Sequence, residues 1–373
     1  MTHPLLPPGV TGTPSCDLYT DTNDPFSFGL RPEQDFLLTD FHPEDEQAAE
    51  TMNVWVHDGE RNTGFNIHAQ MHGGEMRAPV TIFLPDGRIL RIRTDDPARF
   101  DDPVRPHARH VQYECIRPYR QWRYTITDMP VWVTSHDELT AGAIADETPT
   151  TKVSLRAEAT TLNPAWLQGT LVREAHDALA AGQATWIAAH TRKGLSSEAF
   201  RFEQTIVCEG EIEFEGQVYP FKGYGLRGHV RGTRIMGGMN SGHSWISGAT
   251  PGGTAFGLLS FPRDGGGFHL NEAFVFKKGV LYPSRIQYAP PMSYDWAEPG
   301  YVIELVSDQL GLTRITGRDD RLFWWSMPAW GSGQPPRWGV DPAAPMVMRQ
   351  ALARFEIDGE TAYGMNERSG PRP

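Results

Sequence analysis

A long succession of short apolar runs fills the sequence from about residue 52 to residue 366. The runs are rich in Val, Ile, Trp, Thr and Phe, which favour strands, and turn residues such as Pro85-Asp86-Gly87 and Asp358-Gly359 separate them. The interval 163–192 instead places apolar residues near helical spacing after a candidate N-cap at Asn163. Many short strands and one helix predict an all-β protein of two sandwich or barrel units with a linking helix.

The length of the chain predicts two domains. At 373 residues the chain is long for a single hydrophobic core. Residues 1–50 are Pro-rich and acidic and show no sustained period, which predicts an arm on the surface. Residues 51–195 then form a first β-domain with the linker helix, and residues 196–373 form a second β-domain.

Charge and cysteine content exclude several classes of function. A formal net charge of −12 disfavours phosphate backbones, so no nucleic-acid partner is expected. No apolar run approaches the roughly 20 residues of a membrane-spanning helix. The first residues lack the pattern of a secretory signal, so a cytoplasmic location is expected. Cys16, Cys115 and Cys208 have neither disulfide nor metal-knuckle spacing, and no metal or cofactor is predicted.

Unusual residues concentrate between residues 219 and 272, inside segments that otherwise read as strands. Because side chains alternate along a strand, His243 and Trp245 point the same way and Ser244 points the other way. Leu270 and Glu272 share a face by the same alternation. If the face of His243 and Trp245 is the inside of a barrel, an imidazole and an indole line one wall of a cavity in the second domain.

Several short motifs carry a resemblance to a known family. The motifs are Leu84-Pro85-Asp86-Gly87-Arg88, Arg117-Pro118 with Trp122-Arg123, the Gly-rich approach 223–229, Gly242-His243-Ser244-Trp245, and the closing Asp358-Gly359-Glu360 with Glu367-Arg368. Through them the chain resembles the hydroxyneurosporene synthase (carotenoid 1,2-hydratase) and AttH-like superfamily. The resemblance implies two consecutive lipocalin-like (calycin) barrels over roughly residues 50 to 370.

The resemblance also implies a catalytic pattern. Hydratase members carry a His-x-Trp pair, which His243 and Trp245 match, and then an aromatic residue two positions before a carboxylate. Glu272 stands at the carboxylate position, whereas Leu270 replaces the aromatic residue. Many relatives have Asp before the histidine, and this chain has Gly242. The replacement of that Asp by Gly242 weakens any role that needs an ionised partner beside His243.

Hydration or dehydration at an allylic carbon needs a proton donor and a pocket that tolerates a carbocation. Burial raises the pKa of a carboxyl group, so Glu272 is the candidate acid. Trp245 offers an aromatic face to the cation, a contact that contributes about 0.5 to 2 kcal/mol. His243, with an ordinary pKa of about 6.5, positions water or returns the proton.

Each of these residues also has a purely structural interpretation. A tryptophan on a strand of an all-β core usually packs, and a histidine there is usually a hydrogen-bonded interior residue. A buried Glu272 needs a partner or a proton. Arg227, Arg231, Arg234 or Arg285 could pair with Glu272 and make it structural.

The predicted function is that of a cofactor-independent hydratase, dehydratase or isomerase acting on an apolar terpenoid alkenol, in a cavity formed by or between the barrels. The predicted substrate-binding residues are Tyr224, His229, Leu270, Trp324 and Trp325. Two alternatives stay open: a lipocalin-like binding protein for a hydrophobic ligand, and a pericyclase that preorganises a polyene. The expected partner is a small hydrophobic substrate, and a homo-oligomer stays open.

Overall fold

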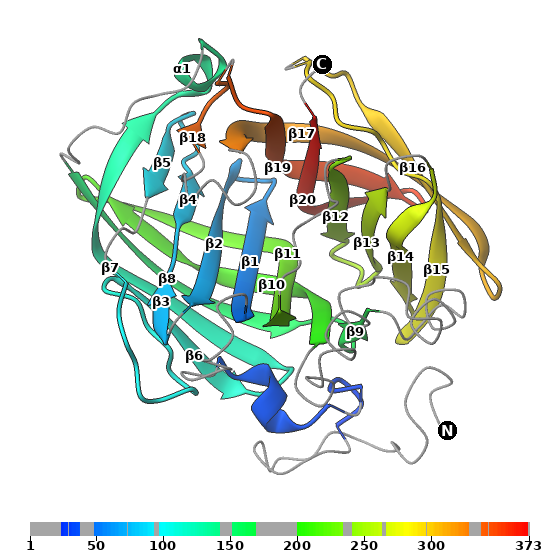
Figure 1. Cartoon of the computed structure of the whole chain (residues 1–373), viewed down its shortest axis with the longest axis horizontal. Helices are drawn as coiled ribbons and strands as arrows, with labels where there is room; N and C mark the ends of the chain where they lie inside the picture. Colours follow the sequence, from blue (N-terminus) through cyan, green and yellow to red (C-terminus); the bar gives the residue numbers. More distant parts are fainter. Residues whose placement is uncertain are drawn as a thin grey trace.

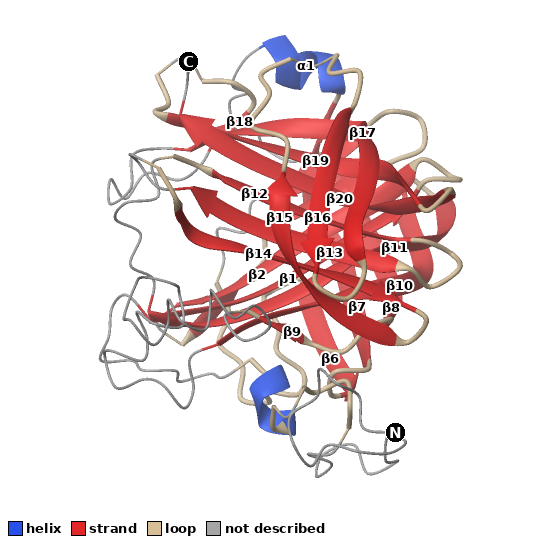
Figure 2. Cartoon of the chain, turned by 90° about the vertical axis from the view of Figure 1, so that its right-hand side faces the viewer, coloured by secondary structure: helices blue, strands red, loops and turns tan. Residues whose placement is uncertain are grey.

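The computed structural model describes residues 24–28, 30–37, 48–72, 74–92, 97–141, 151–168, 200–233, 241–262, 266–295, 297–327, 337–341 and 343–371. These residues form two sheets that each close on themselves, and the two barrels lie side by side (Figure 1). Strands make up nearly all the regular structure of this part of the chain (Figure 2). The predicted all-β fold of two consecutive lipocalin-like barrels is confirmed.

The first barrel closes where β1 pairs with both β2 and β11. The strands of its ring are β1 (Ala48–Asp58), β2 (Thr63–His72), β4 (Val80–Phe83), β5 (Ile89–Ile92), β7 (Gln121–Thr134), β8 (Thr151–Thr161), β10 (Phe200–Phe214) and β11 (Gln217–Thr233). Three further strands attach to the ring: β3 (Glu75–Arg77), β6 (Val111–Arg117) and β9 (Trp166–Leu167). Closure leaves the eight ring strands without a free edge.

The second barrel closes where β16 pairs with β17. Its ring contains β12 (His243–Ala249), β13 (Ala255–Pro262), β14 (Phe268–Lys277), β15 (Val280–Tyr288), β16 (Tyr301–Ser307), β17 (Gly311–Met327), β19 (Met346–Ile357) and β20 (Glu360–Pro371). The short β18 (Arg337–Trp338) pairs with β17. Within the ring, β12 lies between β13 and β20, so the start and the end of this sheet are neighbours.

The hairpin of β10 and β11 belongs to the first barrel. β10 pairs with β8, and β11 pairs with β1, so residues 200–233 supply the strands that close the first sheet. The sequence-based boundary after residue 195 instead assigns these residues to the second domain. The sheets divide the described chain between β11 and β12.

Helix is scarce in the described chain. It contains the 3₁₀ helix η1 (Pro32–Asp35) and the short α1 (His136–Ala141), and no helix there is long and apolar enough to cross a membrane. Asn163 does not begin a helix: its Oδ1 accepts the Thr205 backbone N–H at 2.8 Å, and β9 follows it. The rest of the predicted linker helix, residues 169–192, lies outside the described residues.

Strand alternation distributes the buried apolar side chains of the described residues over five clusters, and three of them explain how the barrels pack together. Val54 on β1 joins the core of the first barrel, and Ile246 on β12 joins the core of the second. Their neighbours Trp55 and Trp245 point the opposite way, into a third cluster that draws on both barrels. Both faces of these strands are therefore buried, one inside a barrel and one in the layer between the barrels.

His57 lies in this layer and ties the barrels together. Its buried Nδ1 lies 3.0 Å from the Ala353 carbonyl oxygen, its Nε2 lies 3.6 Å from Asp320, and its ring meets Tyr363 edge to face. Burial lowers the pKa of His57, although the Ala353 hydrogen bond and the charge of Asp320 oppose that effect. The folded protein therefore holds this imidazole neutral, with Nδ1–H as the donor.

The His57 environment predicts a loss of stability in mild acid. Below the ordinary pKa of about 6.5 the unfolded chain takes up a proton that folded His57 resists, so the free energy of unfolding falls as pH drops. The variant His57→Asn keeps a donor for Ala353 and does not titrate. Urea unfolding at pH 7.5 and 5.5 should show a smaller fall for the variant than for the wild type. An equal fall in both proteins contradicts this assignment.

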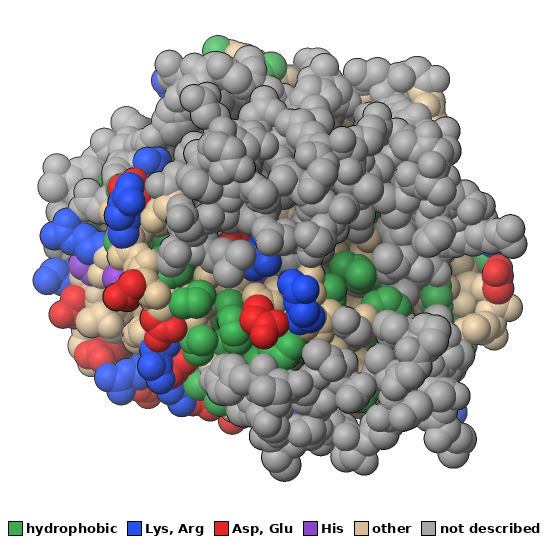
Figure 3. Space-filling view, turned by 60° about the horizontal axis from the view of Figure 1, so that its bottom comes forward, with side chains coloured by type: hydrophobic (Ala, Val, Ile, Leu, Met, Phe, Trp, Pro, Cys, Tyr) green, Lys and Arg blue, Asp and Glu red, His purple; other side chains and the backbone are tan. Residues whose placement is uncertain are grey.

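Acidic and basic side chains lie interspersed on the described surface of the first barrel in the face shown in Figure 3. The exposed ion pairs include Arg123 with Glu114 and with Glu158, each at 2.7 Å. Pairs of this kind contribute little to stability because water solvates both charges. The ion pair of Arg227 with Asp35 is instead buried, so water solvates neither charge.

Candidate functional site

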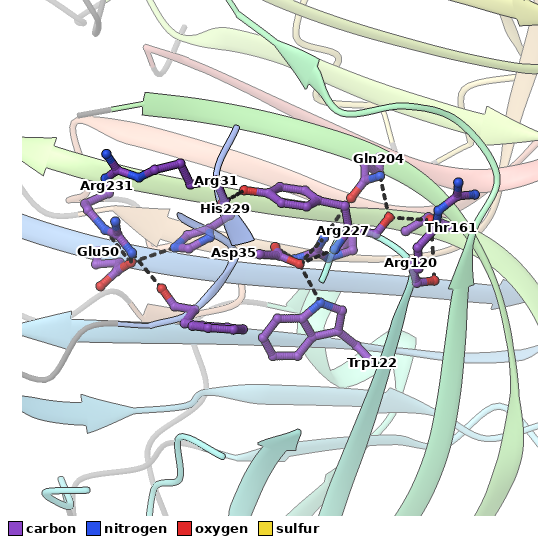
Figure 4. A network of polar contacts seen from close by, with 12 residues as sticks. Arg31, Asp35, Glu50, Arg120, Trp122, Thr161, Gln204, Arg227, His229 and Arg231 are labelled. Carbon is purple, nitrogen blue, oxygen red and sulfur yellow. Dashed lines mark hydrogen bonds and ion pairs between the residues drawn. The ribbon is translucent and has the colours of Figure 1, made fainter. Parts of the chain in front are cut away.

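A buried polar network inside the first barrel holds the described part of the N-terminal segment in place (Figure 4). Asp35 of η1 forms an ion pair with Arg227 of β11 and accepts the Trp122 indole N–H at 3.0 Å and the Tyr119 backbone N–H at 2.6 Å. Asp35 and Arg227 are both buried. The segment that precedes the barrel is therefore fastened inside it by a buried charge pair.

A second buried group in this barrel contains His229, which the sequence predicts as a substrate-binding residue. His229 Nε2 lies 2.7 Å from Glu50 Oε1, and the Arg231 Nε–H donates to the same oxygen at 2.8 Å. Burial lowers the pKa of His229, although the bond to Glu50 opposes this. His229 thus lies in the first barrel, among charges that bind one another.

A pocket of about 480 Å³ opens at one end of the second barrel. Strand ends of β12, β13, β14, β15 and β20 line it, together with residues 289–294. Three of the most exposed large aromatic side chains of the described chain lie here: Phe268, Tyr288 and Tyr294 are 49%, 48% and 36% exposed. An apolar pocket with exposed aromatic residues suits an apolar ligand.

His243 lines this pocket and lies between two hydrogen-bonding partners from β20. Its Nε2 lies 2.7 Å from Glu367 Oε1, and its Nδ1 lies 2.6 Å from Ser369 Oγ. The ring also packs against Phe261, with ring centroids 5.3 Å apart. The imidazole is therefore held on both nitrogens while part of it faces the pocket.

Glu367 is buried and ionised. Burial opposes its ionisation, but the hydrogen bond from His243 and the bond from the Gln350 side-chain amide lower the pKa of Glu367 overall. Gln350 is fixed in turn, because its Oε1 accepts the Trp325 indole N–H at 2.6 Å. Since a carboxylate only accepts hydrogen bonds, His243 Nε2 donates to it, and in the neutral form of the ring Nδ1 carries the lone pair. The arrangement is suited to general acid and base chemistry.

The strand register explains why these residues meet. β12 and β20 are antiparallel, with His243 opposite Ser369 and Trp245 opposite Glu367, so the four side chains share one face. Gly242 has φ +81°, and a Cβ there would lie 2.0 Å from the Ser369 carbonyl oxygen. The position therefore requires glycine. The carboxylate that Gly242 cannot supply comes from Glu367, 124 residues after His243 in the chain.

Trp245 joins the two barrels. Its indole N–H donates to Glu203 Oε2 at 3.0 Å. The indole ring also packs against β11, since a Cβ added at Gly228 would lie 3.6 Å from it. Arg201 and Gln168 also donate to Glu203. Burial raises the pKa of Glu203, although Arg201 and the Trp245 bond oppose the shift. The predicted common face of His243 and Trp245 is thus the outside of the second barrel, toward the first, and Trp245 does not line the pocket.

Glu272 lies on the same outer face, two strands from Trp245. Leu259 of β13 pairs with Trp245 on one side and with Glu272 on the other, so the two Cα atoms are about 10 Å apart at ordinary strand spacing. Glu272 is 0% exposed and is not part of the pocket lining. Leu270 lies one row away, opposite Phe261.

Three of the four arginines considered as partners of Glu272 lie against other carboxylates. Arg227 pairs with Asp35 and Arg231 with Glu50, both inside the first barrel. Arg285 lies 3.3 Å from Asp308. Arg234 lies outside the described residues.

The remaining predicted substrate-binding residues are dispersed. Tyr224 of β11 stacks on Tyr363 at the layer between the barrels. Trp324 and Trp325 point to opposite faces of β17: Trp324 stacks on Tyr294 of the pocket, and Trp325 stacks on Trp338. Of the residues predicted for the site, His243 lines the pocket. Trp325 is linked to the site by hydrogen bonds, because its indole N–H donates to Gln350 and the Gln350 amide donates to Glu367.

Sequence reasoning missed Glu367, Ser369, Gln350 and Glu203. Glu367 and Ser369 are two apart in a run that reads as strand, so their common face could have been inferred. No local pattern, however, indicates that this last strand pairs with β12. Glu203 lies on β10, which the predicted boundary after residue 195 places in the second domain with Trp245 but which belongs to the first barrel.

A family model described as Domain of unknown function (DUF7064) matches residues 39–372. No curated protein matches the sequence. Among solved structures, an AttH-like protein of Nitrosomonas europaea is similar with a TM-score of 0.57 and 15% identity, over 91% of this chain and 94% of that chain. This likeness confirms the fold implied by the family resemblance.

Two further structures are more distant. CghA with Sch210972 has a TM-score of 0.47 and 13% identity, over 87% of this chain and 88% of that chain. Kievitone hydratase of Nectria haematococca has a TM-score of 0.43 and 9% identity, over 86% of this chain and 88% of that chain.

Proposed function

Because the chain belongs to the family described as Domain of unknown function (DUF7064), whose description assigns no activity, we propose a function from the site itself. The function is that of a cofactor-independent hydratase, dehydratase or isomerase acting on an apolar alkenol of the terpenoid class. The observation that carries the proposal is His243, held between Glu367 and Ser369 on the wall of a pocket with an aromatic rim.

His243 is the proposed proton-transfer group. In the dehydration direction the protonated ring donates to the leaving hydroxyl group, and the neutral ring then takes a proton from the adjacent carbon. Hydration reverses both steps, with the ring accepting a proton from the adding water. Glu367 stabilises the imidazolium form by a charge-assisted hydrogen bond. A group of this kind accelerates proton transfer by about 10² to 10⁴-fold.

The aromatic rim is the proposed binding surface for the hydrocarbon part of the substrate. Phe268, Tyr288 and Tyr294 offer ring faces that attract a developing cation, each by about 0.5 to 2 kcal/mol depending on desolvation. The sequence-based roles of Trp245 and Glu272 stay part of the proposal only if substrate also reaches the layer between the barrels, where both side chains lie.

Oxygen exchange tests the activity directly. The protein is incubated with an alkenol such as linalool in water enriched in ¹⁸O, and the alcohol is analysed by mass spectrometry. A hydratase or dehydratase incorporates label into the alcohol or releases water and the dehydrated hydrocarbon, which is a triene when the alkenol is linalool. Saturable binding with no labelled alcohol, no dehydrated hydrocarbon and no rearranged isomer of the alkenol would show a carrier protein and end the enzyme proposal.

The variant Glu272→Gln separates the two candidate proton donors. Gln has nearly the same shape but cannot protonate a substrate. Because Glu272 lies off the pocket wall, we expect the variant to keep alkenol turnover within about tenfold of the wild type. Complete loss of turnover, with fold and ligand binding intact, would instead identify Glu272 as the acid.

A further inference from the structure

Ser369 is the third member of the hydrogen-bonded series around His243. Its Oγ lies 2.6 Å from His243 Nδ1 and accepts the His243 backbone N–H at 3.0 Å. Since Nε2 donates to Glu367, Nδ1 is an acceptor, and the hydroxyl proton of Ser369 points to it. A hydroxyl, an imidazole and a carboxylate thus stand in series, and both Ser369 and His243 line the pocket.

We propose that Ser369 is a nucleophile activated by His243 and Glu367, and that the pocket hydrolyses neutral apolar carboxylic esters through an acyl-serine. The geometry meets the requirements for such a nucleophile: a base within hydrogen-bond reach, oriented by a third group. These residues come in the chain order His, Glu, Ser, and triads are defined by geometry rather than by order. This activity goes beyond the proposed function, although it uses the same histidine.

The reaction balances with an ester and water alone. Ser369 Oγ bonds to the ester carbonyl carbon while its proton moves to His243 Nδ1. The tetrahedral intermediate then collapses, the bond from carbon to the alcohol oxygen breaks, and Nδ1–H protonates the departing alcohol. Water repeats the two steps on the acyl-serine, which releases the carboxylic acid and restores the Ser369 hydroxyl. Glu367 holds Nε2–H throughout.

The pocket lining indicates the class of ester. Its described residues include no Lys, Arg, Asp or Glu. Its apolar side chains come from four prolines, Met292, Ile286, Ala289 and the aromatic rim of Phe268, Tyr288 and Tyr294. A charged acyl or alcohol group would lose its hydration without gaining a partner. Esters of short neutral acids with apolar alcohols fit this lining better than charged esters.

A fluorophosphonate probe and 4-nitrophenyl butanoate test the proposal on the full chain. The probe should add to Ser369, as located by peptide mass spectrometry, and Ser369→Ala should lose both the adduct and at least about 100-fold of ester turnover. Ser247→Ala is the matched control, because Ser247 is a buried serine on β12 whose hydroxyl donates to the Phe256 carbonyl oxygen at 3.1 Å and which is not part of the described pocket lining. This control should hydrolyse the ester at the wild-type rate.

Two further measurements keep the test independent of folding and of the proposed function. Ser369→Cys keeps a nucleophile, and iodoacetamide should modify it faster in the presence of His243 than in the double variant with His243→Gln. A wild-type protein that hydrates the alkenol but forms no adduct at Ser369 overturns the nucleophile and leaves the proposed function standing.

Discussion

Replacement of His243 by glutamine is expected to lower alkenol turnover by about 10² to 10⁴-fold. Gln retains a polar side chain of similar reach but neither donates nor accepts a proton near neutral pH. Binding of the substrate rests on the aromatic rim, so kcat should fall and KM should change little. Steady-state kinetics with the alkenol measure both.

Replacement of Glu367, the hydrogen-bond partner of His243, tests the same proton-transfer role. Glu367→Gln leaves a hydrogen-bonding group beside Nε2 but removes the charge that stabilises the imidazolium, so kcat should fall in the same direction. His110→Gln is the matched control, since His110 is half-buried on the first barrel, away from the pocket lining, and its Nδ1 lies 2.9 Å from the Thr127 carbonyl oxygen. Wild-type kcat in His243→Gln, with the control also unchanged, excludes His243 from catalysis.

Replacement of Asp35 by asparagine is expected to destabilise the protein by about 3 to 5 kcal/mol. The variant leaves Arg227 charged and buried in the first barrel without its carboxylate. It also removes the charge that accepts the Trp122 indole N–H and the Tyr119 backbone N–H. The free energy of unfolding from urea titration measures the loss.

Two comparisons show whether the buried charge is the cause. In Asp35→Asn with Arg227→Met the uncompensated guanidinium is gone, so much of the lost stability should return. Arg123→Gln removes an exposed arginine that pairs with Glu114 and Glu158, and it should cost under about 1 kcal/mol. Equal losses in Asp35→Asn and Arg123→Gln would contradict a buried pair at Asp35.

Alternation along strands predicted the common faces but not which side of a barrel they occupy. His243 and Trp245 do share a face, and so do Leu270 and Glu272. In a single barrel the apolar face points inward. Here Ile246 and Trp245 are both buried, one in the core of the second barrel and one between the barrels. Periodicity alone does not distinguish these two environments.

Pairing between strands that lie far apart in the chain explains why the sequence did not predict the partners of His243 and Trp245. The carboxylate partner of His243 comes from β20, and the acceptor of the Trp245 indole comes from β10 of the other barrel. Each partner depends on how a sheet closes, which no local motif specifies. The boundary after residue 195 is displaced for the same reason, because closure of the first ring requires β10 and β11.

The pairing of β12 with β20 also has a kinetic consequence. During synthesis on the ribosome, β12 emerges well before β20. The pairing of these two strands can therefore form only after about a hundred further residues have been made. His243 is synthesised early, and Glu367 and Ser369 follow only with β20. A nascent chain in which β20 has not yet emerged from the ribosome therefore lacks the hydrogen bonds from Glu367 and Ser369 that would make His243 reactive. Completion of the barrel and completion of the site are the same folding event.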